Sequence, residues 1–126
     1  MTKAWSLDPA LFAGKVEEDA VKLQRAIAIQ ILERIDFASP VDSGRFRNNN
    51  MVSLVTPDYS STTEVDPSGA KALQRGIAVI SKASNYGAIY IQNNLPYAEE
   101  LERGHSKQAP TGVYANAFNG VAQAYK

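Results

Sequence analysis

The sequence predicts a small α+β domain, in which a long amino-terminal amphipathic helix packs on a small, mostly antiparallel sheet with one or two further short helices. Three observations predict this class. Apolar residues recur at steps of three and four over the first third of the chain, two short segments rich in β-branched residues follow, and a polar loop comes after the first of these segments. No repeat or break in composition divides residues 1–126, so a single domain is expected.

The long helix is expected from about Gly14 to Phe37. Apolar residues at steps of three and four fall on one stripe of an α-helix. This stripe consists of Val16, Ala20, Leu23, Ile27, Ile31 and Ile35. A second flank, Ala28, Ile29 and Leu32, is also apolar, and either the rest of the monomer or a neighbouring subunit must cover it.

The flanking residues fit the two ends of this helix. Glu17, Glu18 and Asp19 lie near its expected start, where the helix dipole favours anions. Pro40 follows its expected end, where the chain must leave the helical conformation.

The middle of the chain predicts a strand, a loop and a second helix. Asn50–Thr56 has the β-branched residues of a strand and polar residues on both sides. Pro57–Ser68 has little to bury, and is expected to be a surface loop that is either mobile or functional. A helix over residues 72–80 should follow, capped by Asp66 or Ser68.

The last third predicts a strand, a short helix and a segment of open state. Ile89 and Ile91 alternate with polar or aromatic residues, as in a strand with one buried face. Pro96 begins a short helix, and Gly104 lies where a left-handed residue would end it. Val113–Tyr125 is apolar enough for a helix, but its glycine and asparagines leave that assignment open.

Composition excludes several classes of function. The chain has 13 Lys and Arg against 13 Asp and Glu, so its net charge near zero argues against nucleic-acid binding. The absence of cysteine excludes disulfides, thiolate nucleophiles and cysteine-based metal sites, and one histidine cannot form a two-histidine metal site. The glycines match neither a P-loop nor a dinucleotide-binding pattern. We therefore expect no cofactor and no metal.

The sequence also argues against contact with a membrane. No apolar run approaches the ~20 residues of a membrane helix, and the amino terminus lacks the profile of a secretory signal. We therefore expect the protein to be made in the cytoplasm.

Catalysis is the main alternative to a structural role. His105 lies beside Ser106, and Asp42 lies beside Ser43, so the residue types of a Ser-His-Asp triad are present. No Gly-x-Ser-x-Gly elbow accompanies them. We therefore expect no enzyme, and keep a small hydrolase using His105 with a nearby serine as the alternative.

The first of two polar motifs is PVDSGRFRNN, at residues 40–49. Its residue types suit a fixed backbone corner. Pro40 sets the exit from the helix, Asp42 can accept hydrogen bonds from nearby backbone amides, and Gly44 permits a positive φ. Arg45 is placed to pair with a carboxylate.

The second motif is LPYAEELERGHSKQAP, at residues 95–110. Tyr97 lies at the start of the expected helix, Glu102 is the candidate partner for Arg45, and Gly104 lets the chain reverse into the residues that follow. An ion pair between Arg45 and Glu102 would join the two motifs, within one subunit or between two.

At these two motifs the sequence resembles tail-completion proteins, the small neck or head–tail joining components of tailed bacteriophages. SPVDSGRFRNNNMVS resembles the family's Pro-Val-Asp-Thr-Gly-Arg signature, with Ser43 in place of the commoner threonine. IYIQNNLPYAEELERGHSKQAPTGVY resembles its second signature. The resemblance implies that the motif residues serve assembly: Pro40, Asp42, Gly44, Arg45, Tyr97, Glu102, Gly104, His105, Ser106, Gln108 and Pro110.

The resemblance implies a virion structural protein. Such proteins form rings, often hexamers, which complete or terminate the tail tube and help to join it to the head. The expected partners are further copies of the chain, the tail-tube protein and the head-side connector proteins, with transient proximity to DNA in the channel. A ring subunit needs two different surfaces that meet head to tail.

Overall fold

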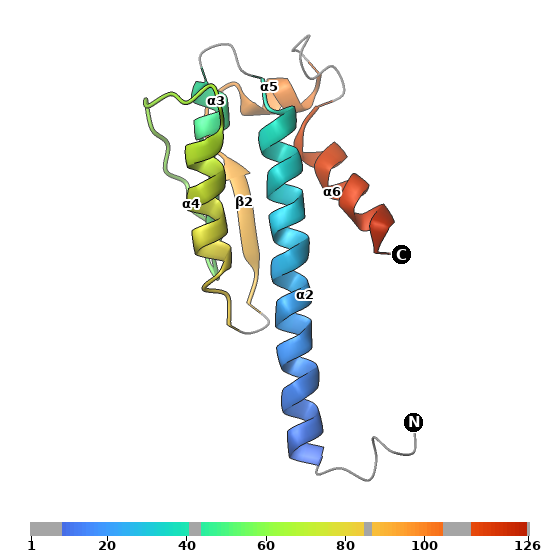
Figure 1. Ribbon diagram of the computed structural model, residues 1–126. Helices are drawn as coiled ribbons and strands as arrows, with labels where there is room; N and C mark the ends of the chain where they lie inside the picture. The colour runs from blue at the N-terminus through green and yellow to red at the C-terminus, as the bar shows by residue number, and fades with distance from the viewer. Residues whose placement is uncertain (1–8, 41–43, 85–86, 105–111, 126) are drawn as a thin grey trace.

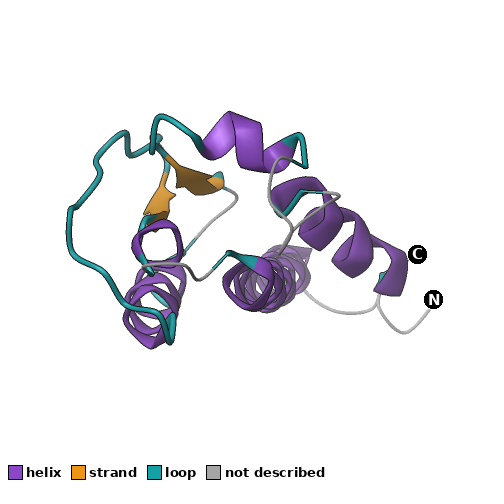
Figure 2. Cartoon of the chain, turned by 90° about the horizontal axis from the view of Figure 1, so that it is seen from above, coloured by secondary structure: helices purple, strands orange, loops and turns teal. Residues whose placement is uncertain are grey.

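The computed structural model describes residues 9–40, 44–84, 87–104 and 112–125, and confirms the α+β class (Figure 1). Its elements are α2 (Pro9–Ala38), α3 (Arg45–Asn48), β1 (Asn50–Leu54), α4 (Ala70–Ile80), β2 (Ile89–Asn93), α5 (Ala98–Glu102) and α6 (Tyr114–Ala124). Seen along α2, the sheet and α4 lie on one side of this helix and α6 lies on the other (Figure 2). The long helix is therefore covered from two directions.

The sheet consists of β1 and β2, which pair antiparallel with Asn50 opposite Asn93 and Leu54 opposite Ile89. We expected the first strand to reach Thr56, but it ends at Leu54. Val55 has a φ of 71°, a left-handed conformation that a β-branched residue rarely adopts, and this turns the chain out of the strand. Within the described residues no third strand joins the pair.

The main core lies where α2 meets α4 and β1. Leu32 and Ile80 are fully buried there, and Ala28 and Val52 pack against them. Gly76 of α4 faces this contact, because a Cβ at that position would lie 2.9 Å from Cγ2 of Val52 and would also overlap the Leu32 side chain. A glycine that weakens the helix locally thus allows its close approach to α2.

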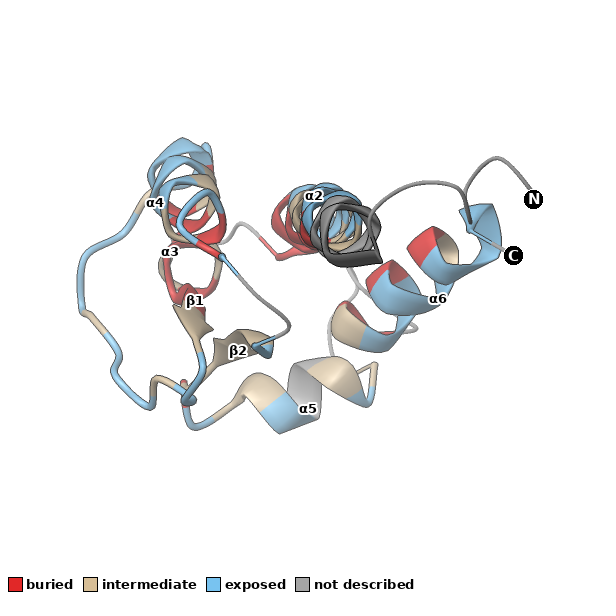
Figure 3. Cartoon of the chain, turned by 90° about the horizontal axis from the view of Figure 1, so that it is seen from below, coloured by how far each residue is buried: buried red, intermediate tan, exposed pale blue. Residues whose placement is uncertain are grey.

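Burial shows how the two apolar flanks of α2 are covered. The second flank, with Ala28 and Leu32, forms the core. In the first stripe Ile35 is buried, whereas Leu23 is 49% exposed and Ile31 is only partly covered. Figure 3 shows the buried part of α2 facing α4 and the sheet. Ile35 of the first stripe is buried against Val113 and Ala117. The periodicity therefore found the helix, and each of its two apolar flanks is partly covered within the monomer.

The ends of the helices also differ in part from expectation. Helix α2 begins at Pro9, earlier than Gly14, so the acidic residues lie inside the helix rather than at its start. Glu18 there pairs with Lys22, one turn later, at 3.3 Å between two exposed side chains. The open carboxyl-terminal segment is helical, as α6.

The caps of the later helices follow the expected residues. Oδ2 of Asp66 accepts a hydrogen bond from the amide of Lys71 at 2.9 Å, and Oγ of Ser68 accepts one from the amide of Ala70 at 3.2 Å. The N-cap residue of α4 is Gly69, which has no side chain to bond with, so Asp66 and Ser68 bond the first amides of the helix from outside the N-cap position. Gly104, after α5, has the expected left-handed φ, 88°.

Asp36 is buried near the end of α2, where its surroundings disfavour the ionised form of its carboxyl group. The side chain is 7% exposed and packs against Gly69, where a Cβ would overlap both carboxyl oxygens. Burial raises the pKa of Asp36 from 3.8 to about 6, against the opposing charge of Arg47, and Asp66 adds to the rise. The folded state therefore holds this proton more tightly than the unfolded chain does.

We expect Asp36→Asn to stabilise the protein at neutral pH. Because the folded pKa is raised, the contribution of Asp36 to stability is complete below about pH 4 and is lost as the pH rises through 6. The amide should increase the free energy of unfolding at pH 8 by on the order of 2 kcal/mol and remove this part of the pH dependence. Urea titrations at pH 4, 6 and 8 measure it, with exposed Glu33→Gln on the same helix as the control. Equal pH profiles for wild type and Asp36→Asn would contradict the assignment.

Candidate functional site

The first motif forms a tight corner at Gly44. Its φ is 80°, and a Cβ there would overlap the backbone of Asp66 and Pro67, so the corner requires glycine. The Gly44 carbonyl oxygen accepts hydrogen bonds from the amides of Asn48 and Asp66, each at 3.1 Å. The corner is thereby fixed to the end of the long loop. Asp42, also expected to act here, lies outside the described residues.

The arginine with a clear role at this corner is Arg47, which the sequence analysis did not single out. Its guanidinium donates to the carbonyl oxygens of Phe37, Ser39 and Pro67, each at 3.0 Å. One side chain thus ties the end of α2 to the loop before α4. Arg45 lies half-buried in the first turn of α3. Two arginines two residues apart offer no sequence signal that separates these roles.

Asparagine side chains hold the long loop against the sheet. The amide group of Asn49 bonds both backbone groups of Thr62, accepting at 2.9 Å and donating at 3.0 Å. Nδ2 of Asn94 donates to the carbonyl oxygens of Asp58 at 2.7 Å and Ser60 at 2.8 Å. The loop forms no strand, so its backbone groups have no partners in the sheet. The asparagine side chains provide those partners and hold this surface loop in one arrangement.

Asn50 joins three elements from a fully buried position. Its Nδ2 donates to Oγ of Ser39 at 3.0 Å, at the end of α2. Its Oδ1 accepts from Nδ2 of Asn93 at 3.1 Å, on β2, and from the Tyr114 hydroxyl at 2.6 Å, on α6. Burial, with the Glu102 carboxylate nearby, raises the pKa of Tyr114, so its hydroxyl stays a donor.

The second motif places Glu102 at the amino end of α6. Its carboxylate accepts hydrogen bonds from the amides of Val113 at 3.0 Å, Tyr114 at 2.7 Å and Ala115 at 2.8 Å. Burial opposes ionisation, but the three amides outweigh it and lower the pKa of Glu102. The structure therefore gives Glu102 a different partner from the expected Arg45: it caps a helix.

Residues other than Arg45 and Glu102 bring the two motifs into contact. The rings of Phe46 and Tyr97 have centroids 6.3 Å apart, and Nδ2 of Asn93 donates to the Phe46 carbonyl oxygen at 2.9 Å. Phe46 and Glu102 also line one small cavity of about 220 Å³. The last four assembly candidates lie outside the described residues: His105, Ser106, Gln108 and Pro110.

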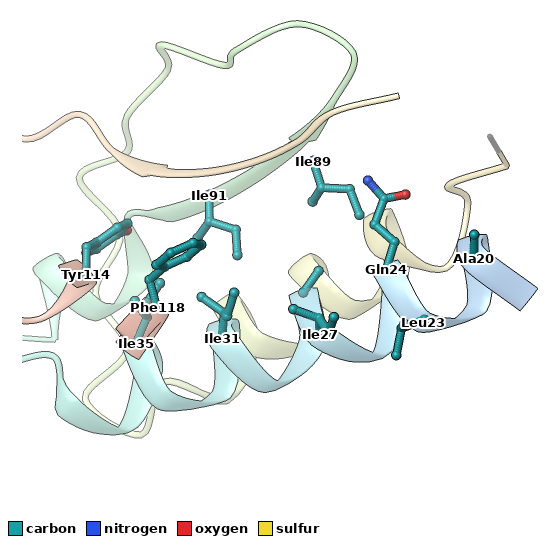
Figure 4. Close-up of a pocket in the computed structure, with 11 residues that line it drawn as sticks. Ala20, Leu23, Gln24, Ile27, Ile31, Ile35, Ile89, Ile91, Tyr114 and Phe118 are labelled. Atoms are coloured by element: carbon teal, nitrogen blue, oxygen red, sulfur yellow. The ribbon is translucent and has the colours of Figure 1, made fainter. Parts of the chain in front are cut away.

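A second surface feature is an apolar groove of about 570 Å³ between α2, β2 and α6. In Figure 4, Ile27 and Ile31 of α2 lie across from Ile89 and Ile91 of β2, with Phe118 of α6 near one end. The groove is lined by Ala20, Leu23, Gln24, Ile27, Ala28, Ile31, Ile35, Ile89, Ile91, Tyr114 and Phe118. Most of the first apolar stripe of α2 thus lines an open groove.

The part of the chain described by the structure offers little for catalysis. It contains no group of three acidic or histidine side chains that could hold a metal ion. The triad candidates His105, Ser106, Asp42 and Ser43 lie outside that part. Among the helices in it, none has an apolar stretch sufficient to cross a bilayer.

Comparison with known proteins adds no identification, because no family model, curated protein or solved structure matches the chain.

What the structure brings together is a polar corner built on two motifs and an apolar groove beside it. The polar side chains bind the protein's own backbone, so the corner acts as a scaffold, and the apolar groove is the candidate binding surface.

We expect Glu102→Gln to lower the free energy of unfolding by about 1 kcal/mol at pH 7, because a charged cap is lost from α6. Since the folded pKa is lowered, the contribution of Glu102 is present above its ordinary pKa of 4.5 and is lost as the pH falls through the folded value. The penalty should therefore shrink in acid, as measured by urea unfolding at pH 7 and pH 3.

The matched control is Glu99→Gln on the same short helix. Glu99 pairs with Arg103 at 3.7 Å, but both side chains are largely exposed, and such pairs contribute little. Losses of equal size for the two variants would show that Glu102 does not cap α6.

Proposed function

We propose that the chain is a virion structural protein of a phage neck, which completes or terminates the tail tube and helps to join tail to head as part of a ring. The observation that supports this most directly is the use of the motif side chains. The polar atoms of the Glu102 and Asn49 side chains form hydrogen bonds with backbone groups of other segments of the chain. Motifs used in this way preserve the shape of a subunit, as a structural component requires.

The arrangement of surfaces supports a ring. A closed ring needs two different surfaces on each subunit. The groove lies between α2, β2 and α6. The long loop lies on the side of α4 and the sheet that is far from α6 (Figures 2 and 3). The loop exposes Tyr59 and Val65 while its backbone is held by asparagines. The groove and the loop are therefore two separate surfaces of different chemistry.

The partners in this proposal are further copies of the chain, the tail-tube protein and the head-side connector proteins. The protein would be made in the host cytoplasm and reside in the virion at the neck. DNA would pass through the channel of the ring, and a chain with balanced charge suits a wall that does not hold DNA.

Head–tail joining in extracts tests the proposed function. Disrupting the gene in the phage or prophage that encodes the chain should yield filled heads and finished tail tubes that remain separate, because the joining component is missing. Adding the purified chain should restore joined particles, counted by electron microscopy, whereas buffer alone should not. Normal joining in the disrupted phage would contradict the proposed function.

A further inference from the structure

Helix α2 is longer than the body that it packs on. Figure 1 shows its amino-terminal turns extending past the sheet and α4. Contacts with the body are made from Val21, which is buried, and from Gln24, whose Nε2 donates to the Gly87 carbonyl oxygen at 2.8 Å. The segment before them, Pro9–Ala20, is called the overhang here, and its twelve residues span ~18 Å at the rise of an α-helix.

The groove matches the overhang in length. Its floor on α2 extends from Ala20 to Ile35, which corresponds to ~22 Å along the helix axis. The groove could therefore hold a helix of three to four turns. Because α2 is one continuous helix, the overhang cannot fold back onto its own groove, so any overhang in the groove must come from another copy.

The groove also matches the overhang in apolar character. Its α6 wall contains no Asp, Glu, Lys or Arg from Gly112 to Tyr125, and Phe118 in this wall is 60% exposed. Depletion of charge with exposed aromatic side chains is typical of the centre of a protein interface. In the sequence of the overhang, Phe12 and Val16 continue the stripe of Ala20 at steps of four.

The charges on the two sides of the contact are of opposite sign. The overhang has three acidic residues against the single Lys15, a net charge of −2. Behind the lining residues of this wall, the guanidinium of Arg34 on α2 lies over Gly120 of α6, where a Cβ would overlap it. An acidic helix therefore meets an uncharged wall with an arginine behind it.

From these matches we propose that the overhang of one copy occupies the groove of a second copy. The inference deepens the proposed function, and rests on it in expecting that copies associate. Each subunit then provides one overhang and accepts another, so the contact joins two different surfaces and repeats head to tail, as a ring requires. A neighbouring subunit would then cover the apolar stripe of α2 that the monomer leaves open.

Point variants on the two surfaces test this contact in the full-length protein. Phe118→Glu in the groove and Val16→Glu in the overhang should each weaken self-association by at least about 100-fold, because an unpaired carboxylate would be buried. Native mass spectrometry and sedimentation across a range of concentrations measure the effect, and circular dichroism checks the fold. The wild-type chain should form assemblies of more than one copy.

Two controls introduce a glutamate on α2 away from the contact. Phe37→Glu changes a phenylalanine that is 86% exposed at the other end of α2, outside the groove. Ala26→Glu adds a carboxylate at an exposed position of α2 that does not line the groove. Both controls should associate like the wild type.

Mixing the two damaged variants gives the decisive measurement. The Phe118→Glu chain keeps its overhang and the Val16→Glu chain keeps its groove, so one contact of the proposed kind remains between them. Equimolar mixing should therefore produce a one-to-one pair, while each variant alone stays monomeric.

Three outcomes would overturn the inference: a monomeric wild type, assemblies that survive both substitutions, or damaged variants that fail to pair on mixing. If the chain nevertheless restores head–tail joining in extracts, the proposed function stands and only this contact is wrong. If the variants pair as expected but joining needs no chain, the contact stands and the proposed function is wrong.

Discussion

The buried amide of Asn50 holds the three parts of this molecule in one arrangement. It donates to Ser39 at the end of α2, and accepts from Asn93 on the sheet and Tyr114 on α6. A buried amide left without these partners would cost more than the bonds contribute, so all three must be present together. The position of α6 beside α2 depends on this satisfied group together with the packing of Ile35 against Val113 and Ala117.

The same principle explains why a small sheet can support a long loop. Two strands offer few backbone partners, and a loop of this length would otherwise leave its backbone polar groups without a fixed place. Asn49 and Asn94 provide the missing donors and acceptors from within the fold. Rigidity in this protein thus comes from side-chain amides and from Arg47 and Glu102, which bind backbone atoms far away in the sequence.

The polar side chains described above bind inside the fold, and the groove beside them is apolar. It lies between α2, β2 and α6 and is bounded by a helix without charges. A surface of this kind suits a partner that is recognised by shape and burial rather than by ions. In the proposed ring, the groove and the held loop would be the two different surfaces that head-to-tail assembly requires.

Local patterns in the sequence determined the class of the fold, the existence of the long helix, the loop, the caps Asp66 and Ser68 and the left-handed Gly104, because each depends on spacing or on residues near in the chain. The tertiary structure alone decided which apolar face of α2 is buried. It also decided that Glu102 caps α6 and that Arg47 ties the corner to the end of α2. Those outcomes depend on which distant segments meet, and periodicity along one helix carries no information about what covers each side of it.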